Sequence, residues 1–270
     1  MAHEKIHGET GRAWDIVAQV KYDAELEEHL HLLRSVGHTL LQAEIDALQP
    51  YLSGANVVHL QCSHGLEALG LLNLGAASVT GFDISPTMIR QAQRKAEALG
   101  KPATFVCSDV LSIPSDFDGS ADLVYTGKGA LPWLMDLSLW GKMVARLLRP
   151  GGRIFVFEGH PLDWLWERDV DSLQLRKGVG YFDSEPRENP GFPSDVVERE
   201  LGQQRPRFLE RQWRPDQVIA CLLAAGLRLE SFQEHPLLFW DQFPQWPKQL
   251  QARLPHSYSI MAVREGGKRG

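Results

Sequence analysis

The sequence of 270 residues lacks most features of disulfide-bonded, metal-binding and membrane-spanning proteins. Its three cysteines, Cys62, Cys107 and Cys221, include no CxxC pair, so we expect neither a disulfide framework nor a zinc site. No apolar run approaches the roughly 18 residues that cross a bilayer. The polar residues 1–11 lack the apolar core of a secretory signal. We therefore expect a soluble cytoplasmic protein with no bound metal and no membrane partner.

Positive charge is also in short supply, with 28 Lys and Arg residues against 34 Asp and Glu residues and a formal charge of −6. An acidic chain of this kind repels polyanions, so nucleic acid is not an expected partner. Hydrophobic residues make up 43% and charged residues 23%, near globular averages, which excludes disorder and coiled coil. The length suits one large domain or one domain with an insertion, as a monomer or a homodimer.

Apolar residues recur at helical spacing through residues 1–50, which predicts a helical N-terminal arm. Beyond the arm, short apolar runs alternate with helical segments. Such alternation indicates a doubly wound, mostly parallel α/β sheet covered on both faces, with ligands beyond the carboxyl ends of its strands. The predicted strands are residues 56–60, 78–82, 103–107, 121–126, 153–158, 227–234 and 258–263, the last antiparallel, with a turn at 150–152 before the fifth.

Residues 161–214 separate the fifth strand from the next helix and are rich in aromatic side chains. A stretch this long is uncommon as a plain connection. We expect an insertion that forms a lid over the ligand crevice; a dimer surface is the alternative. The core then comprises residues 51–160 and 215–265. The aromatic residues expected on the substrate side are Trp164, Tyr181 and Trp213 of the insertion, with Trp14 and Tyr22 of the arm.

Four arginines, Arg205, Arg207, Arg211 and Arg214, form the one basic concentration near this crevice. Guanidinium groups bind carboxylate and phosphate bidentately. The cluster therefore indicates either an acidic acceptor or a solvated face balanced by nearby glutamates. An RNA acceptor is the competing version of the first interpretation.

The segment from Val57 to Gly65 combines a predicted strand, a tight turn and a helix start, where backbone N–H groups can meet a ligand carboxylate or phosphate. Asp83 ends the next strand, 18 residues after Gly65 and close to the roughly 20 typical of a ribose-binding acid. An acid at that place can accept protons from both ribose hydroxyls. A plain turn glycine and a plain cap aspartate are the alternatives for these two residues.

These motifs, followed by FVCSD ending at Asp109 and LLRPGG ending at Gly152, resemble the class I S-adenosylmethionine-dependent methyltransferases in residues 56–158 and, more loosely, 213–264. The resemblance implies a Rossmann-like fold. It also implies that Asp83 holds the ribose, that Asp109 meets the adenine amino group, and that S-adenosyl-L-homocysteine is the product. The cofactor-binding residues implied are His59, Gln61, Cys62, Ser63, His64, Gly65, Asp83, Ile84, Ser85, Ser108, Asp109, Val110, Thr126, Gly127, Lys128 and Gly129.

The first motif departs from the family pattern Asp-x-Gly-x-Gly-x-Gly, because its four positions are His59, Gln61, Ser63 and Gly65. The version here is similar to a bacterial subgroup of small-molecule methyltransferases. A dinucleotide pyrophosphate needs three glycines for close backbone approach, so Gln61 and Ser63 disfavour NAD more than S-adenosylmethionine. In this interpretation the Gln61 side-chain amide replaces a missing backbone contact.

Methyl transfer from a sulfonium is an in-line displacement, in which the protein aligns the nucleophile and excludes water. We predict transfer to an oxygen or nitrogen of a small-molecule acceptor. If a general base is needed, His160 and Glu158 at the end of the fifth strand are the candidates, with His64 a third. A turn residue is the alternative for His160, and Glu158 can instead orient the cofactor site. The competing functions are a non-catalytic adenosyl-ligand sensor and an RNA methyltransferase.

Overall fold

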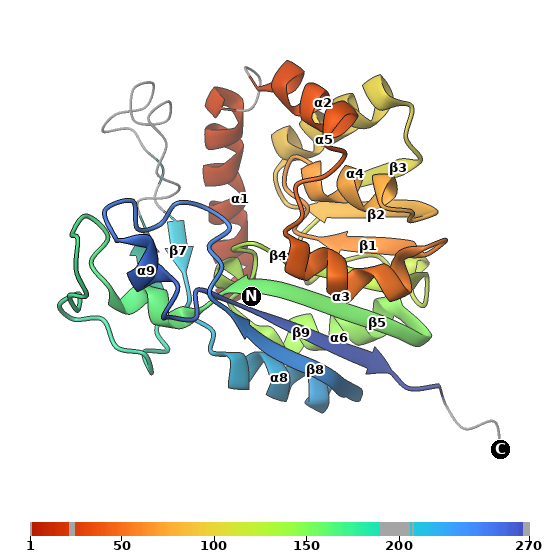
Figure 1. Cartoon of the computed structure of the whole chain (residues 1–270). Helices are drawn as coiled ribbons and strands as arrows, with labels where there is room; N and C mark the ends of the chain where they lie inside the picture. Colours follow the sequence, from red (N-terminus) through yellow and green to blue (C-terminus); the bar gives the residue numbers. More distant parts are fainter. Residues whose placement is uncertain (1, 22–24, 190–205, 207, 267–270) are drawn as a thin grey trace.

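The computed structural model describes residues 2–21, 25–189, 206 and 208–266. The strands of its central sheet are β1 (Asn56–Leu60), β2 (Ser78–Asp83), β3 (Ala103–Cys107), β4 (Ala121–Gly127), β5 (Leu148–Gly159), β8 (Leu227–His235) and β9 (Ser257–Arg264). They lie in the order β3-β2-β1-β4-β5-β9-β8 (Figure 1). Neighbours from β3 to β5 run parallel, whereas β9 runs antiparallel to both β5 and β8. The predicted fold class is confirmed, including its antiparallel last strand.

The helices are α1 (Ala2–Lys21), α2 (Leu26–Ser35), α3 (Gln42–Leu52), α4 (Leu66–Asn73), α5 (Pro86–Leu99), α6 (Leu137–Leu147), α8 (Pro215–Ala224) and α9 (Lys248–Gln251). Each face of the sheet has its own apolar core. Trp140 of α6 and Leu222 of α8 belong to one core, and Leu48 of α3, Leu69 of α4 and Ala92 of α5 belong to the other. The sheet is thus buried on both sides, and its strand ends remain as the place for a site.

Local signals in the sequence set the ends of α5. The Ser85 hydroxyl accepts the Met88 N–H as the N-cap, and Pro86 occupies the first helical position. Gly100 follows the helix with a φ of 60°, where a glycine carries little steric cost. The chain that leaves β2 is therefore turned into α5 immediately after Asp83.

The turn predicted at residues 150–152 needs correction. β5 already begins at Leu148, which pairs with Ala121, and the register shifts before Leu123 pairs with Arg153. Gly151, with a φ of 82°, lies inside this irregular start of the strand. A bulged strand tolerates the proline and glycines that the sequence pattern alone assigned to a turn.

The insertion holds the elements that the sequence did not predict. In the arm, which was predicted to be helical, α1 begins at Ala2 and lies alongside the carboxyl ends of the strands (Figure 1). The insertion contains a short helical turn, η3 (Pro161–Leu165), and a two-stranded sheet of β6 (Arg187–Asn189) and β7 (Phe208–Glu210). Strands of three residues give too short a pattern for prediction. No helix among the described residues has the length and apolar character needed to cross a bilayer.

Candidate active site

A cavity of about 540 Å³ opens at the carboxyl ends of the strands. One end is lined by loops after β1, β2 and β3 together with α1, and the other by the insertion and residues 236–256 between β8 and β9. Many predicted residues line it together: His59, Gln61, Cys62, Ser63, His64, Asp83, Ile84, Asp109, Val110, Gly127, Lys128, Gly129, Glu158, His160, Trp14 and Trp164.

The turn after β1 forms without two of the three family glycines. Gln61 and Ser63 adopt φ values of 54° and 49°, in the left-handed region, at the two positions where the family pattern has glycine. Such a conformation costs a non-glycine residue about 1–2 kcal/mol. Gly65 cannot be replaced in the same way, because a Cβ there would lie 2.7 Å from that of Ala92 in α5. Close packing of the turn on α5 explains why this glycine is retained.

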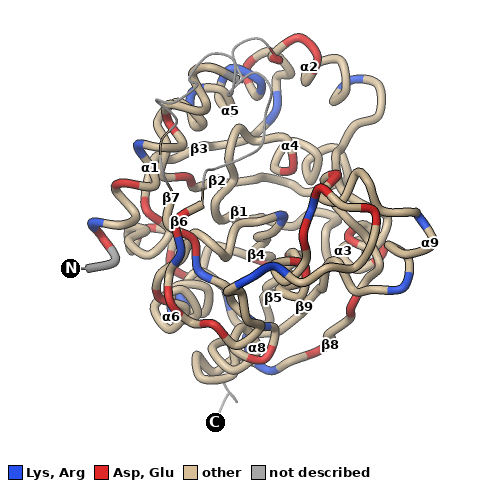
Figure 2. The backbone as a smooth tube through the Cα atoms, turned by 90° about the vertical axis from the view of Figure 1, so that its left-hand side faces the viewer, with Lys and Arg blue, Asp and Glu red and all other residues tan. Residues whose placement is uncertain are grey.

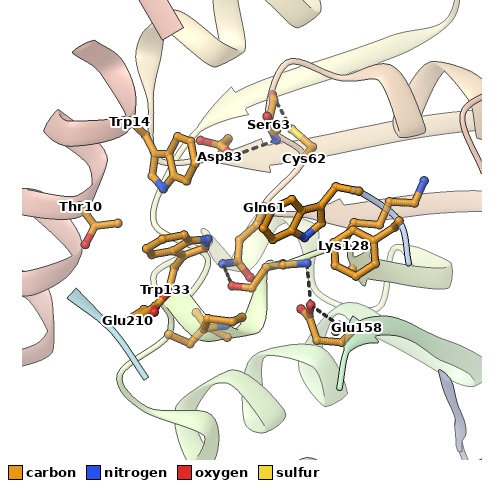
Figure 3. Close-up of a pocket in the computed structure, with 18 of the residues that line it drawn as sticks. Thr10, Trp14, Gln61, Cys62, Ser63, Asp83, Lys128, Trp133, Glu158 and Glu210 are labelled. Atoms are coloured by element: carbon orange, nitrogen blue, oxygen red, sulfur yellow. Dashed lines mark hydrogen bonds between the residues drawn. The ribbon is translucent and has the colours of Figure 1, made fainter. Parts of the chain in front are cut away.

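Asp83 organises the turn from the end of β2. One carboxylate oxygen accepts the Ser63 N–H at 2.9 Å and the other accepts the Ser85 N–H at 2.9 Å. Burial raises the pKa of Asp83, against the effect of these hydrogen bonds. Each oxygen keeps a further lone pair for a ligand hydroxyl. In Figure 3 Asp83 and Ser63 lie at one side of the cavity, near Trp14.

Asp109 is linked to the N-terminal helix. His7 of α1 donates from Nδ1 to an Asp109 oxygen at 2.7 Å, and its Nε2 accepts the Met135 N–H at 3.2 Å. The second Asp109 oxygen accepts the Leu111 N–H at 2.9 Å. Asp15, the residue after Trp14, accepts the Ser85 hydroxyl and the Thr87 N–H. These contacts hold α1 against the loops after β2 and β3; no sequence pattern pointed to His7.

The loop after β4 is held from two sides. Gln61 Nε2 donates to the Ala130 carbonyl at 2.7 Å, while its buried Oε1 has no hydrogen-bond partner in the described part of the chain. The Glu158 carboxylate accepts the N–H groups of Gly129 at 2.6 Å, Leu131 at 2.9 Å and Gly159 at 2.8 Å (Figure 3). With three donors on one buried carboxylate, the geometry makes Glu158 a positioning residue for this loop rather than a base.

The ammonium group of Lys128 in the same loop binds other protein groups and not the ligand. Its Nζ donates to the Thr39 carbonyl at 2.8 Å and lies 3.4 Å from Glu44 and 3.3 Å from Glu67. Burial opposes ionisation of Glu67, but Lys128 and neighbouring histidines hold the pKa of Glu67 at about 2. Burial lowers the pKa of nearby His59 to about 4, so this imidazole is neutral near pH 7.

His160, the first candidate for a general base, lines the cavity. Its Nδ1 accepts the Leu162 N–H at 3.2 Å, which leaves Nε2 to donate to Glu234 at 3.0 Å. Both ring nitrogens are therefore engaged, and the geometry gives no free lone pair to accept a proton. His64, the third candidate, stacks on His29 of α2 with ring centroids 4.9 Å apart.

Four predicted cofactor contacts lie outside the cavity lining. Gly65 and Ser85 shape the turn and the helix cap described above, and Ser108 donates to the Asp109 carbonyl. Thr126 is fully buried and donates to the Leu60 carbonyl at 3.3 Å. Thr126 points into the sheet because successive residues of a strand alternate between its two faces.

Some of the predicted lid residues line the cavity and others do not. Trp164 and Trp14 line the cavity, whereas Tyr181 and Trp213 do not. Trp213 donates from its indole nitrogen to the Leu134 carbonyl at 2.9 Å, which turns the ring to another surface. Tyr22 lies outside the described residues. Cavity residues that the sequence analysis missed include Trp133, Asp163, Arg168, Glu210, Phe239 and Trp240; the run of aromatic residues from Phe239 to Trp246 was the one available signal.

Comparison with known proteins places this geometry in a family. Residues 57–152 match the family model described as a methyltransferase domain. The ubiquinone biosynthesis O-methyltransferase of Xanthomonas oryzae pv. oryzae is 28% identical over 130 residues, 48% of this chain and 52% of that protein. The demethylmenaquinone methyltransferase of Thermus thermophilus is 38% identical over 85 residues, 32% of this chain and 38% of that protein. The chain thus spans about half the length, or less, of these curated relatives.

Solved structures share the fold. A Mesorhizobium loti S-adenosylmethionine-dependent methyltransferase superposes with a TM-score of 0.60 at 20% identity, over 82% of this chain and 96% of that one. The geranyl diphosphate C-methyltransferase of Streptomyces coelicolor superposes with a TM-score of 0.55 at 16% sequence identity. The match covers 82% of this chain and 75% of that one. A [4+2]-cyclase also superposes with a TM-score of 0.55, at 17% sequence identity. The fold alone therefore does not specify the reaction.

The family match, the relatives and the fold agree with one another. Residues 57–152 match a methyltransferase domain, and the relatives and the solved structures agree with the resemblance to the class I S-adenosylmethionine-dependent methyltransferases drawn from the sequence. S-Adenosylmethionine is the cofactor of this family.

Proposed function

We propose that the protein transfers a methyl group from S-adenosylmethionine to an oxygen or nitrogen of a small-molecule acceptor by in-line displacement. The main support for the proposal is that a single continuous cavity joins the two ends of the site. It runs from Asp83 and Asp109, past the loop after β4, to Trp164 and Trp240. A volume of about 540 Å³ with two chemically different ends suits two ligands lying side by side.

The donors and acceptors at one end fit the cofactor. Asp83 keeps lone pairs for ribose hydroxyls, and Asp109 lies at the place that the family pattern gives to the adenine. The unpartnered buried Oε1 of Gln61 is an acceptor suited to the ammonium group of the methionyl part. When bound, S-adenosylmethionine supplies an electrophilic methyl group on a sulfonium. The assignment of the individual contacts is part of the proposal.

The chain itself supplies alignment and exclusion of water. Trp14 and Trp133 pack edge to face with ring centroids 5.3 Å apart and close one wall of the cavity (Figure 3). Glu158 fixes the loop beside which the reacting atoms would meet, and a displacement needs them about 3–3.5 Å apart. Burial raises the pKa of Asp163 on the acceptor side to about 6, so this carboxylate can take a proton near neutral pH.

Charge supports a small acceptor rather than RNA. Figure 2 shows acidic and basic residues interspersed over the described part of the face at the strand ends, with neither sign forming a continuous stripe. Together with the net charge of −6, this arrangement gives a polyanion no local field to bind. Of the four predicted arginines, Arg205 and Arg207 lie outside the described residues, and Arg211 and Arg214 lie away from the cavity.

Calorimetry with S-adenosylmethionine, S-adenosylhomocysteine and NAD tests the proposal. We expect micromolar binding of the first two and none of NAD, followed by release of S-adenosylhomocysteine when a panel of phenols, amines and acids is supplied. Binding of both adenosyl ligands without turnover on any acceptor would favour the sensor. Binding of NAD alone would overturn the assignment of the cofactor.

A further inference from the structure

The acceptor end of the cavity contains an arginine that forms no side-chain hydrogen bond or ion pair with the described residues. Arg168 follows η3 in the insertion and lines the cavity, partly buried. Among the described residues, no carboxylate oxygen lies within 4.0 Å of its guanidinium and no hydrogen bond from its side chain is formed; its Nε is buried and unpaired. Burial, aided by Arg176, lowers the pKa of Arg168, although the group stays charged. A buried donor left unpaired points to a missing ligand.

The neighbouring carboxylates have partners of their own. Asp163 oxygens lie 2.8 and 3.1 Å from His256 Nδ1, and the His256 Nε2 donates to the Gln251 carbonyl at 2.9 Å. Glu210 accepts a hydrogen bond from the Asn189 amide. Both acids, with Asp169, exert an electrostatic effect on Arg168 without pairing with it. The guanidinium therefore faces the cavity with its fork available.

Aromatic rings lie on one side of Arg168. Its guanidinium carbon lies 5.2 Å from the ring centroid of Trp240, as in a cation–π contact. Trp164 and Phe239 line the same end of the cavity. The Phe239 ring lies against Gly159 at the end of β5, about 3.5 Å from where a Cβ would stand. A planar ligand between these rings would reach from Arg168 toward the loop held by Glu158.

We propose that the acceptor is an aromatic carboxylic acid, with its carboxylate on the Arg168 guanidinium and its ring among Trp164, Phe239 and Trp240. This inference rests on the proposed function, of which it names the substrate class. A guanidinium fork matches a planar carboxylate with two parallel hydrogen bonds. The nearby acids Asp163, Asp169 and Glu210 penalise a dianion, which favours a carboxylate over a phosphate monoester.

The test uses benzoate, benzamide and phenyl phosphate as probes. Their binding is measured by calorimetry and by tryptophan fluorescence, with and without saturating S-adenosylhomocysteine. We expect benzoate to bind at least about tenfold more tightly than benzamide, as two charge-assisted hydrogen bonds require. Arg168→Met should reduce benzoate affinity to the benzamide level, and Arg168→Lys should retain part of it. Binding of S-adenosylhomocysteine by both variants should equal that of the parent, which shows that they are folded.

Arg253→Met is the matched control, because Arg253 is exposed and does not line the cavity. Equal affinity for benzoate and benzamide, tighter binding of phenyl phosphate, absence of benzoate binding, or an Arg168→Met protein with parental benzoate affinity would each overturn the proposal. If S-adenosylhomocysteine failed to bind while the Arg168-dependent preference for benzoate persisted, the proposed methyl transfer would be wrong and the carboxylate subsite would stand.

Discussion

The two ends of the cavity are built in different ways. The cofactor end uses residues that directly follow strands of one parallel sheet, and its polar groups are mutually hydrogen-bonded, as with Asp83 and the N–H groups of Ser63 and Ser85. The acceptor end uses two long connections, residues 160–214 and 236–256, and includes the unpaired Arg168. The difference separates what the fold itself specifies from what insertions add to it.

The contrast extends to how each end is held. Backbone hydrogen bonds fix the cofactor end within the β-α-β unit, so its geometry follows from the register of the strands. The acceptor end depends on side chains from segments far apart, such as His256 behind Asp163, separated by 93 residues. Substitutions at the cofactor end should therefore affect adenosyl-ligand binding and stability together, whereas Arg168 should affect acceptor binding alone.

The largest effect is expected at Asp83. Asp83→Ala removes the ribose contacts together with the support for two N–H groups, and hydrogen bonds to a charged group contribute about 1.5–3 kcal/mol each. We expect affinity for S-adenosylhomocysteine to fall about 10²-fold or more in calorimetry. Asp116→Ala, at an exposed position, is the control. Unchanged affinity in Asp83→Ala would move the ribose site elsewhere.

Substitution of Glu158 tests how the loop after β4 is held at the cofactor end. Glu158→Ala leaves three buried N–H groups without an acceptor, and we expect the free energy of unfolding to fall by about 3–5 kcal/mol in urea titrations. Glu158→Gln keeps one acceptor oxygen and should lose about half as much. A fully stable Glu158→Gln protein that binds the cofactor but has no turnover would instead assign Glu158 a role as base.

His59 should make the cofactor end sensitive to acid. Its pKa falls from 6.5 to about 4 on folding, chiefly by burial, so below pH 6.5 the unfolded chain binds a proton that the folded chain does not. Stability present above pH 6.5 should decline as the pH falls toward 4, by about 3 kcal/mol for this residue. Urea titrations across this range should show a shallower decline in His59→Asn. His31→Asn, at an exposed position, should follow the parent.

His7 tests the attachment of α1 to this end. His7→Ala breaks the contact with Asp109 and should make the amide hydrogens of α1 exchange about tenfold faster, consistent with the loss of about 1.5 kcal/mol. Hydrogen exchange measured by mass spectrometry gives the comparison. Lys5→Ala, on the exposed side of the same helix, should leave the exchange rate unchanged. Equal rates in all three proteins would show that α1 is held by its apolar contacts.

The smallest effect concerns the turn after β1. Ser63 has a positive φ, so Ser63→Gly should be about 1 kcal/mol more stable than Ser63→Ala in thermal or urea unfolding. The same two substitutions at Ser112, which has no positive φ, should give the opposite order because glycine has more freedom in the unfolded chain. Equal stability of the two Ser63 variants would mean that the turn relaxes without strain.

These differences explain what could be predicted. Asp83 could be placed from the sequence because it ends a strand just before a helix cap, and Asp109 because it follows a strand in a motif that resembles the family. His7 could not, because it meets Asp109 across 102 residues through the packing of α1. Arg168 and Glu210 had no periodic pattern around them, and the aromatic content of the insertion did not distinguish Trp164 from Tyr181. Which rings turn inward depends on tertiary hydrogen bonds such as that of Trp213 with Leu134.

The attachment of α1 has a consequence for the timing of ligand exchange. His7, Thr10 and Trp14 line the cavity from a single helix, and Asp15 fixes that helix to the start of α5. A helix that must lift for an adenosyl ligand to pass slows arrival and departure by the same factor. Loosening it therefore speeds the capture of a ligand and its release together, while the dissociation constant, which is the ratio of the release rate to the capture rate, stays nearly the same.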